Sequence, residues 1–284
     1  MNRSLGMLIA RSAAARDTLA VQAGLQEIIK LHPSNRARTW GYFARKLDAY
    51  LNDPSLPIPF QIFANGNSKL PFVAFSAAPI VTCPGAGECE NWCYSFRAWR
   101  GPAAFFRQIL NTLLIVHQSD VISKAFQALP EGIALRLYVD GDFDSLETAR
   151  FWFRLLKSRP DIQAYGYSKS WDILLSVPVD ELPANYRLNL SSGGNGSEAQ
   201  REALRALPIT RGEFLALPID IPKMSNDVKY SSPVYKTALR EAWKSANPDR
   251  PTFLCPGKCG SCTKKEHACG SERFNNVPIL IGIH

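Results

Sequence analysis

All seven cysteines of this chain fall into two groups, and each group opens with Cys-Pro-Gly. The first group consists of Cys83, Cys89 and Cys93, and the second of Cys255, Cys259, Cys262 and Cys269. Cysteines that only pack in a core would be scattered, so this clustering predicts ligands of a metal or an iron–sulfur cluster. Because residues 1–15 lack a clear signal peptide, we expect a reducing, cytoplasmic setting rather than disulfides.

The second group carries enough thiols to complete a site by itself. Four thiolates satisfy either a tetrahedral zinc ion or a [4Fe–4S] cluster. Structural zinc sites favour two Cys-x2-Cys pairs, and here only Cys259 and Cys262 form one. A cysteine followed by proline is typical of ferredoxin-type cluster loops. We therefore expect an iron–sulfur cluster, with zinc as the alternative.

The first group supplies only three thiols. It either holds a [4Fe–4S] cluster with one iron that lacks a cysteine, or it shares ligands with the second group. The chain thus carries one cluster or two. An iron without a cysteine is open to a small molecule, and S-adenosylmethionine is a candidate for that position. Trp92, directly before Cys93, is placed to shield such a cluster from water.

The elements that must position these cysteines alternate in type. Apolar stretches typical of strands cover residues 71–77, 133–139, 162–167, 186–190, 213–219 and 277–283. Helical patterns cover residues 17–29, 38–51, 101–129, 145–157, 197–206 and 232–246, with the third as one helix or two. This alternation predicts an α/β fold, a partial (β/α) barrel of about six mostly parallel strands, with a doubly wound sheet as the competing topology. We expect an N-terminal helical extension over residues 1–58 and a cysteine-rich α/β domain over residues 59–284.

Polar residues follow three of the expected strands. They are Asp140-Gly141-Asp142, Ser168-Lys169-Ser170 and Ser191 to Gly194. In a (β/α) barrel, functional residues gather at the carboxyl ends of the strands. We therefore predict catalytic roles for Lys169, Asp140 and Asp142, and cofactor contacts for Gly141, Ser168 and Ser191. For Asp142, helix capping and loop solvation are the alternative.

Several of these segments resemble the gene product 88 family, which is borne by phages and plasmids. The resemblance runs from about residue 65 to the C-terminus. It is carried by residues 66–69, 82–94, 139–143 and 166–170 and by Cys255-Pro256. It implies an origin in a mobile element and an iron–sulfur site.

The first cysteine group also resembles, more distantly, the radical S-adenosylmethionine superfamily. There, a three-cysteine loop follows the first barrel strand, and a glycine-containing segment ending the second strand contacts the methionine amino group. Here the loop and Gly141 occupy corresponding places, although the Cys-x5-Cys-x3-Cys spacing differs from the superfamily's Cys-x3-Cys-x2-Cys. The resemblance implies redox or radical chemistry at an open iron. The alternative is a non-catalytic module, stabilised by a cluster or by zinc.

The overall composition bears on partners. The net charge is +8 and the pI about 9.2, which is compatible with a nucleic acid or a host protein as partner through a basic surface. No apolar run approaches the length of a membrane-spanning helix, so we expect no membrane partner. No Ser/His/Asp triad is readable, which leaves hydrolysis with little support.

Overall fold

The computed structural model describes residues 2–67, 70–247, 249–260, 262 and 267–283. In this described part, seven parallel strands form one sheet in the order β1-β2-β3-β4-β5-β7-β6. The strands are β1 (Val73–Ala74), β2 (Ala134–Leu137), β3 (Gln163–Ser168), β4 (Tyr186–Ser191), β5 (Thr210–Pro218), β6 (Phe253–Leu254) and β7 (Ile279–Ile283). Of these, β6 has no counterpart among the expected strands. Ser68 and Lys69, in the first of the resemblance segments, lie outside the described residues.

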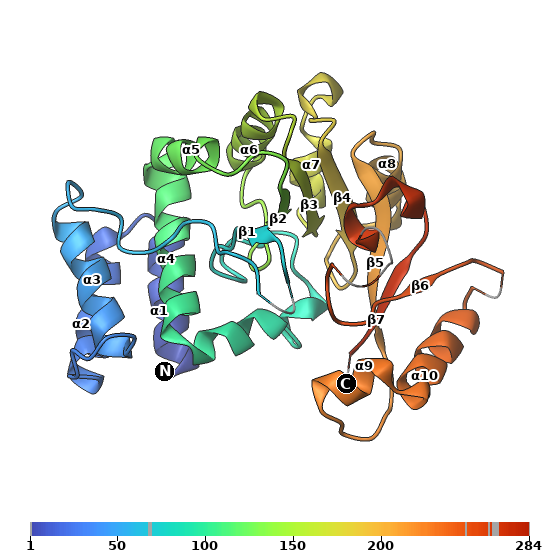
Figure 1. Cartoon of the computed structure of the whole chain (residues 1–284), viewed down its shortest axis with the longest axis horizontal. Helices are drawn as coiled ribbons and strands as arrows, with labels where there is room; N and C mark the ends of the chain where they lie inside the picture. Colours follow the sequence, from blue (N-terminus) through green and yellow to red (C-terminus); the bar gives the residue numbers. More distant parts are fainter. Residues whose placement is uncertain (1, 68–69, 248, 261, 263–266, 284) are drawn as a thin grey trace.

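The strand order decides between the two expected topologies. The first five strands are neighbours both along the chain and in the sheet, without the reversal that defines a doubly wound fold. The sheet curls into part of a barrel, with helices on its outer side (Figure 1). The predicted partial (β/α) barrel is therefore confirmed. The helices are α1 (Arg3–Ala14), α2 (Thr18–Leu31), α3 (Trp40–Asn52), α4 (Pro102–His117), α5 (Ser119–Gln127), α6 (Leu146–Ser158), α7 (Trp171–Leu175), α8 (Glu198–Arg205), α9 (Asn226–Ser231) and α10 (Pro233–Lys244).

Helix starts follow the capping residues of the sequence. Asp17 accepts a hydrogen bond from the Ala20 N–H at 2.9 Å, and Ser145 accepts one from the Thr148 N–H at 3.1 Å. At Ser197 the bond is reciprocal with Gln200, which makes a capping box. The stretch 101–129 forms two helices, because the backbone at Gln118 leaves the helical region between α4 and α5. Expected helices correspond to every long helix except α1.

The N-terminal helices share their core with the barrel. Ile9, Leu25 and Leu47 are fully buried and belong to the same apolar cluster as Phe106 of α4. Helices α1 to α3 lie at one end of the molecule, while α9 and α10 lie at the other (Figure 1). No helix in the described residues is both long and apolar enough to span a membrane.

The two faces of the sheet differ in chemistry. Along β2, Leu135 and Leu137 belong to the core that the outer helices share, so Arg136 between them points to the inner face. Tyr165 and Tyr167 alternate in the same way on β3 and join a separate inner cluster. That cluster also takes in the segment that connects β6 to β7. This segment carries the second cysteine group, and it crosses the inner face as far as β3 and β4.

Candidate functional site

The first cysteine loop is paired with the loop that follows β4. The Cys89 N–H donates to the carbonyl of Gly193 at 3.0 Å, and the Asn195 N–H donates to the carbonyl of Gly85 at 3.1 Å. Ala86 and Gly194 form an isolated antiparallel bridge between the same two loops. The loop after β1 is therefore fixed, through its main chain, at the carboxyl ends of the strands.

Two glycines make this close approach feasible. A Cβ atom on Gly85 would lie 1.7 Å from the carbonyl oxygen of Lys169, so no other residue fits there without moving the backbone. Gly193 has φ +78°, and a Cβ atom there would lie 2.8 Å from the Trp92 ring. Trp92 thus packs on the glycine loop beside Cys89.

The structure brings four of the predicted site residues together. The Lys169 ammonium donates to the Ser191 hydroxyl at 2.8 Å, and the Lys169 N–H donates to the Asp142 carboxylate at 2.7 Å. The Ser168 side chain is also hydrogen-bonded to Asp142. Burial raises the pKa of the Asp142 carboxyl, and the Lys169 N–H opposes that rise.

This group lies next to Cys83. Burial raises the pKa of the Cys83 thiol well above its ordinary value, the Asp142 charge adds to the rise, and Lys169 opposes it. Cys93 is close enough to act on the same thiol. Lys169, Asp142 and the first cysteines therefore share one region at the mouth of the barrel.

Asp140 and Gly141 have different surroundings. The Asp140 carboxylate accepts a hydrogen bond from Gln108 of α4 at 2.9 Å, and Gln108 in turn accepts one from Trp99 at 2.7 Å. Burial raises the pKa of Asp140, against a hydrogen bond from Ser95. Gly141 has φ +81°, and a Cβ atom there would lie 2.6 Å from the Thr82 hydroxyl. These contacts anchor the base of the first cysteine loop.

The second cysteine group lies on the inner face of the sheet. The Cys255 N–H donates to Leu280 of β7 at 2.8 Å, and the Cys269 carbonyl accepts from Asn189 of β4 at 2.9 Å. The Ala268 N–H lies 3.4 Å from the Cys262 sulfur, in hydrogen-bonding position. Backbone donors to sulfur are common where thiolates bind a metal.

The thiols of this group act on one another. Burial raises the pKa of Cys255 to about 12, and the Cys269, Cys259 and Cys262 thiols lie close enough to influence it. Burial also raises the pKa of Cys269 to about 11, while a hydrogen bond to Tyr167 opposes that shift. No group of three or more His, Cys, Asp or Glu side chains that could hold a metal ion occurs among the described residues, which omit Ser261 and residues 263–266 of this loop.

Cations and phenols surround the second group. Arg136 and Arg211 both act electrostatically on Cys269, and Arg136 also acts on Cys259. The Tyr165 hydroxyl is buried near Cys259 and has no hydrogen-bond partner among the described residues, while Tyr167 is hydrogen-bonded to Cys269. Four thiolates around zinc or a [4Fe–4S] cluster leave a net negative charge, which these side chains would offset. The side chains around the second cysteine group therefore fit a zinc ion or a [4Fe–4S] cluster.

The chain matches the family described as gene product 88 over residues 55–276. It belongs to that family. The match confirms the resemblance expected from the cysteine and strand-end segments. No curated protein and no solved structure matches the chain.

Arg136, Arg211, Tyr165 and Tyr167 are absent from the predicted site. Arg136 and Tyr165 face each other across β2 and β3, and both alternate with apolar neighbours. Strict alternation in a strand flags such inward side chains. The sequence does not show that a cysteine loop covers the inner face of the sheet. The alternation alone could therefore not assign these residues to a site.

Proposed function

We propose that this member of the gene product 88 family holds iron–sulfur clusters at its two cysteine groups, and that it originates from a phage or another mobile element. The observation that carries the proposal is the setting of Cys255, Cys259, Cys262 and Cys269. These thiols lie on an aromatic inner face beside the buried Arg211, the half-buried Arg136 and two tyrosines. Such a setting limits the access of water while offsetting the charge of bound thiolates.

Two separate centres are favoured over one shared centre. The neighbours that act on Cys83 are Asp142, Lys169 and Cys93, whereas those that act on Cys255 come from its own group. The groups are linked through Tyr94, which follows Cys93, and Arg136, which bonds Tyr94 and acts on Cys259 and Cys269. In this arrangement the second group is the complete centre, suited to structure or electron relay, and the first is the open one.

A lysine ammonium and a serine hydroxyl, those of Lys169 and Ser191, lie beside the first centre. Lys169, held by Ser191, offers a charge for a carboxylate or phosphate of a small molecule bound near Cys83. A cluster with one open iron supplies redox or radical chemistry when bound, and S-adenosylmethionine is a candidate ligand. Asp142 fixes the Lys169 backbone, and Asp140 fixes the loop base, so both act here by positioning.

Metal analysis tests the proposal. The full chain is purified without oxygen, and iron, sulfide and zinc are measured per chain together with absorption near 400 nm. We expect iron and sulfide for both centres. A colourless protein with stoichiometric zinc would overturn the proposal in favour of zinc-stabilised loops. Addition of S-adenosylmethionine under reducing conditions then tests the open iron, by spectral change and formation of deoxyadenosine.

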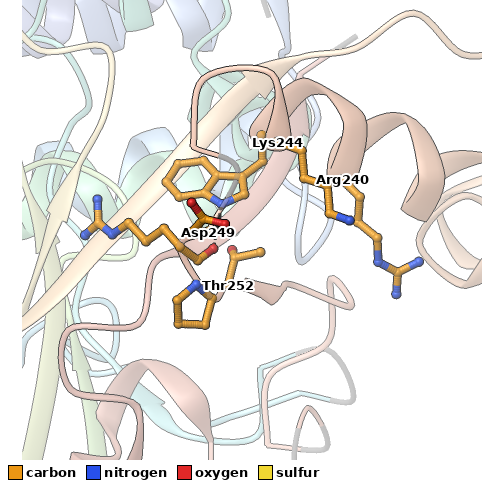
Figure 2. A pocket seen from close by; sticks show the side chains of 7 residues that line it. Arg240, Lys244, Asp249 and Thr252 are labelled. Carbon is orange, nitrogen blue, oxygen red and sulfur yellow. Dashed lines mark hydrogen bonds between the residues drawn. The ribbon is translucent and has the colours of Figure 1, made fainter.

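A second candidate function is binding of nucleic acid or a host protein through the basic surface. Figure 2 shows a hollow where Arg240 and Lys244 of α10 lie near Asp249 and Thr252. Another hollow, along α6, is lined by Arg150, Arg154, Lys157 and Glu181. Cations in such hollows suit phosphate groups.

Salt-dependent retention on single-stranded and duplex nucleic acid tests this candidate. If the hollows bind phosphate, Arg240→Glu with Lys244→Glu lowers both the affinity and the slope of its salt dependence. Arg36→Glu with Arg38→Glu is the matched control, because both residues are exposed in the connection between α2 and α3, away from the two hollows. Equal losses in the two variants would indicate a generic effect of net charge.

A further inference from the structure

Arg136 has more hydrogen-bonding capacity than partners. It is the only charged residue of β2, and it points to the inner face between two apolar neighbours. Its guanidinium donates one long bond, 3.4 Å, to the Tyr94 hydroxyl and lies 4.7 Å from the centre of the Tyr167 ring. Its Nε is buried and has no partner among the described residues. The residue as a whole is half-buried, and the donors of a guanidinium that are shielded from water normally have acceptors.

Two other arginines of the same face show the contrast. Arg211 is fully buried and donates four hydrogen bonds, to Asn189, Phe274, Val277 and Glu213. Arg187, across Tyr165 from Arg136, pairs with Glu272. Of these three, Arg136 is the one whose guanidinium donates to no carbonyl or carboxylate of the described residues, although the Asp140 carboxylate acts on it electrostatically. Its spare donors favour a further anion nearby, because a partly buried cation without close hydrogen-bond partners is costly.

Elements of both cysteine groups meet at Arg136. Tyr94, its hydrogen-bond partner, directly follows Cys93. Tyr167, on whose ring it lies, is hydrogen-bonded to Cys269 of the second group. Arg136 also acts electrostatically on Cys259. One cation thus contacts the residue that follows Cys93 and lies close enough to act on Cys259 and Cys269.

We infer that Arg136 is the shared counter-charge of both cysteine groups, a positioning residue whose free donors face the anionic centres on either side. This inference rests on the proposed function. Removing a positive charge beside a cluster disfavours the extra negative charge of the reduced state, so the reduction potential falls. Because Arg136 lies between the groups, its loss is expected to lower both potentials, while loss of an arginine bound elsewhere lowers neither.

The experiment uses the full chain, loaded with iron and sulfide without oxygen. Midpoint potentials of both centres are measured by titration with electron paramagnetic resonance for wild type, Arg136→Met, Arg136→Lys and the control Arg187→Met. We expect Arg136→Met to change the reduction equilibrium of each centre at least tenfold, which is 59 mV for one electron. Arg136→Lys keeps the charge, so both of its midpoint potentials should lie close to the wild-type values. Arg187→Met should have the same midpoint potentials as wild type.

The outcomes separate this inference from the proposed function. A wild-type protein without iron overturns the proposed function; the role of Arg136 is then measured as zinc loss to a chelator, expected to be at least tenfold faster from both groups in Arg136→Met. Normal cluster content with a shift at only one centre, or at neither, overturns the shared role. If Arg136→Met does not fold, Arg136→Gln and the charge-retaining Arg136→Lys are compared instead, and equal potentials in those two overturn it as well.

Discussion

The first cysteine loop is held by main-chain hydrogen bonds at the mouth of the barrel, whereas the second combines a main-chain bond at Cys255 with side-chain bonds from Asn189 and Arg211 on the inner face. In the first, Gly85 and Gly193 let two backbones touch, and the nearby Lys169 keeps its ammonium on a serine hydroxyl. In the second, Cys269 is buried among aromatic rings. In the proposed function, backbone pairing leaves the side chains of the first region available for a ligand, and the aromatic surroundings of the second suit a structural or electron-relay centre.

The largest expected effect comes from removing a ligand of the second group. Cys269→Ser should abolish its metal and destabilise the protein by about 3 kcal/mol or more, because binding at a four-thiolate site is folding free energy. At this chain length that corresponds to a fall in Tm of roughly 6–12 °C. Thermal unfolding and metal content measure it. Cys83→Ser should lose the first centre with a far smaller fall; equal falls would break the distinction between the two regions.

Next in size is Arg211→Met. It removes a buried cation and leaves the Asn189 side-chain oxygen and three carbonyls without their donor, which should cost about 3–5 kcal/mol. Denaturant unfolding provides the measurement. Arg187→Met is the matched control, because its partner Glu272 is mostly exposed and such a pair contributes about 1 kcal/mol or less. A similar loss of unfolding free energy in both variants would show that Arg211 does not specifically stabilise the second cysteine loop.

Gly85→Ala tests the first cysteine loop. The added methyl meets the Lys169 carbonyl, so the first loop must separate from the strand ends at a cost of about 1–3 kcal/mol. We expect loss of the first centre and retention of the second, measured as iron per chain. Gly101→Ala is the control, because its added methyl would lie 3.8 Å from the Ala98 carbonyl oxygen, an ordinary contact distance. Loss of both centres in Gly85→Ala would mean that the loops depend on each other.

The smallest effect on stability is expected for Lys169→Met. It gives up one hydrogen bond to Ser191, which contributes about 0.5–1.5 kcal/mol. Both metal centres should remain, but the spectral response of the first to S-adenosylmethionine should weaken at least tenfold in apparent affinity. Lys157→Met, on the outer surface of α6, controls for the lost charge. An unchanged response in Lys169→Met would remove this lysine from the ligand site.

The barrel was predictable because its signals are local. Apolar stretches separated by helical patterns specify parallel strands, and Asp17, Ser145 and Ser197 mark helix starts by hydrogen bonds only three residues long. The two-residue strand β6 is too short to leave such a pattern. The meeting of Lys169, Asp142, Ser168 and Ser191 could also be predicted, since the carboxyl ends of parallel strands share one edge. The hydrogen bond from Gln108 of α4 to Asp140 could not be predicted, because Gln108 lies far from Asp140 along the chain.

By itself the sequence determined the two groups of cysteines, the order of strands and helices, and the loops that meet at the mouth of the barrel. All of these depend on residue type and on short spacings. Only the tertiary structure decided that the connection from β6 to β7 crosses the inner face, and that Arg136 of β2 therefore lies near Cys259 while it bonds Tyr94 of the first loop. Which face a crossover covers depends on contacts between residues 80 or more positions apart, such as Asn189 and Arg136 with the second cysteine loop, and no local pattern encodes them.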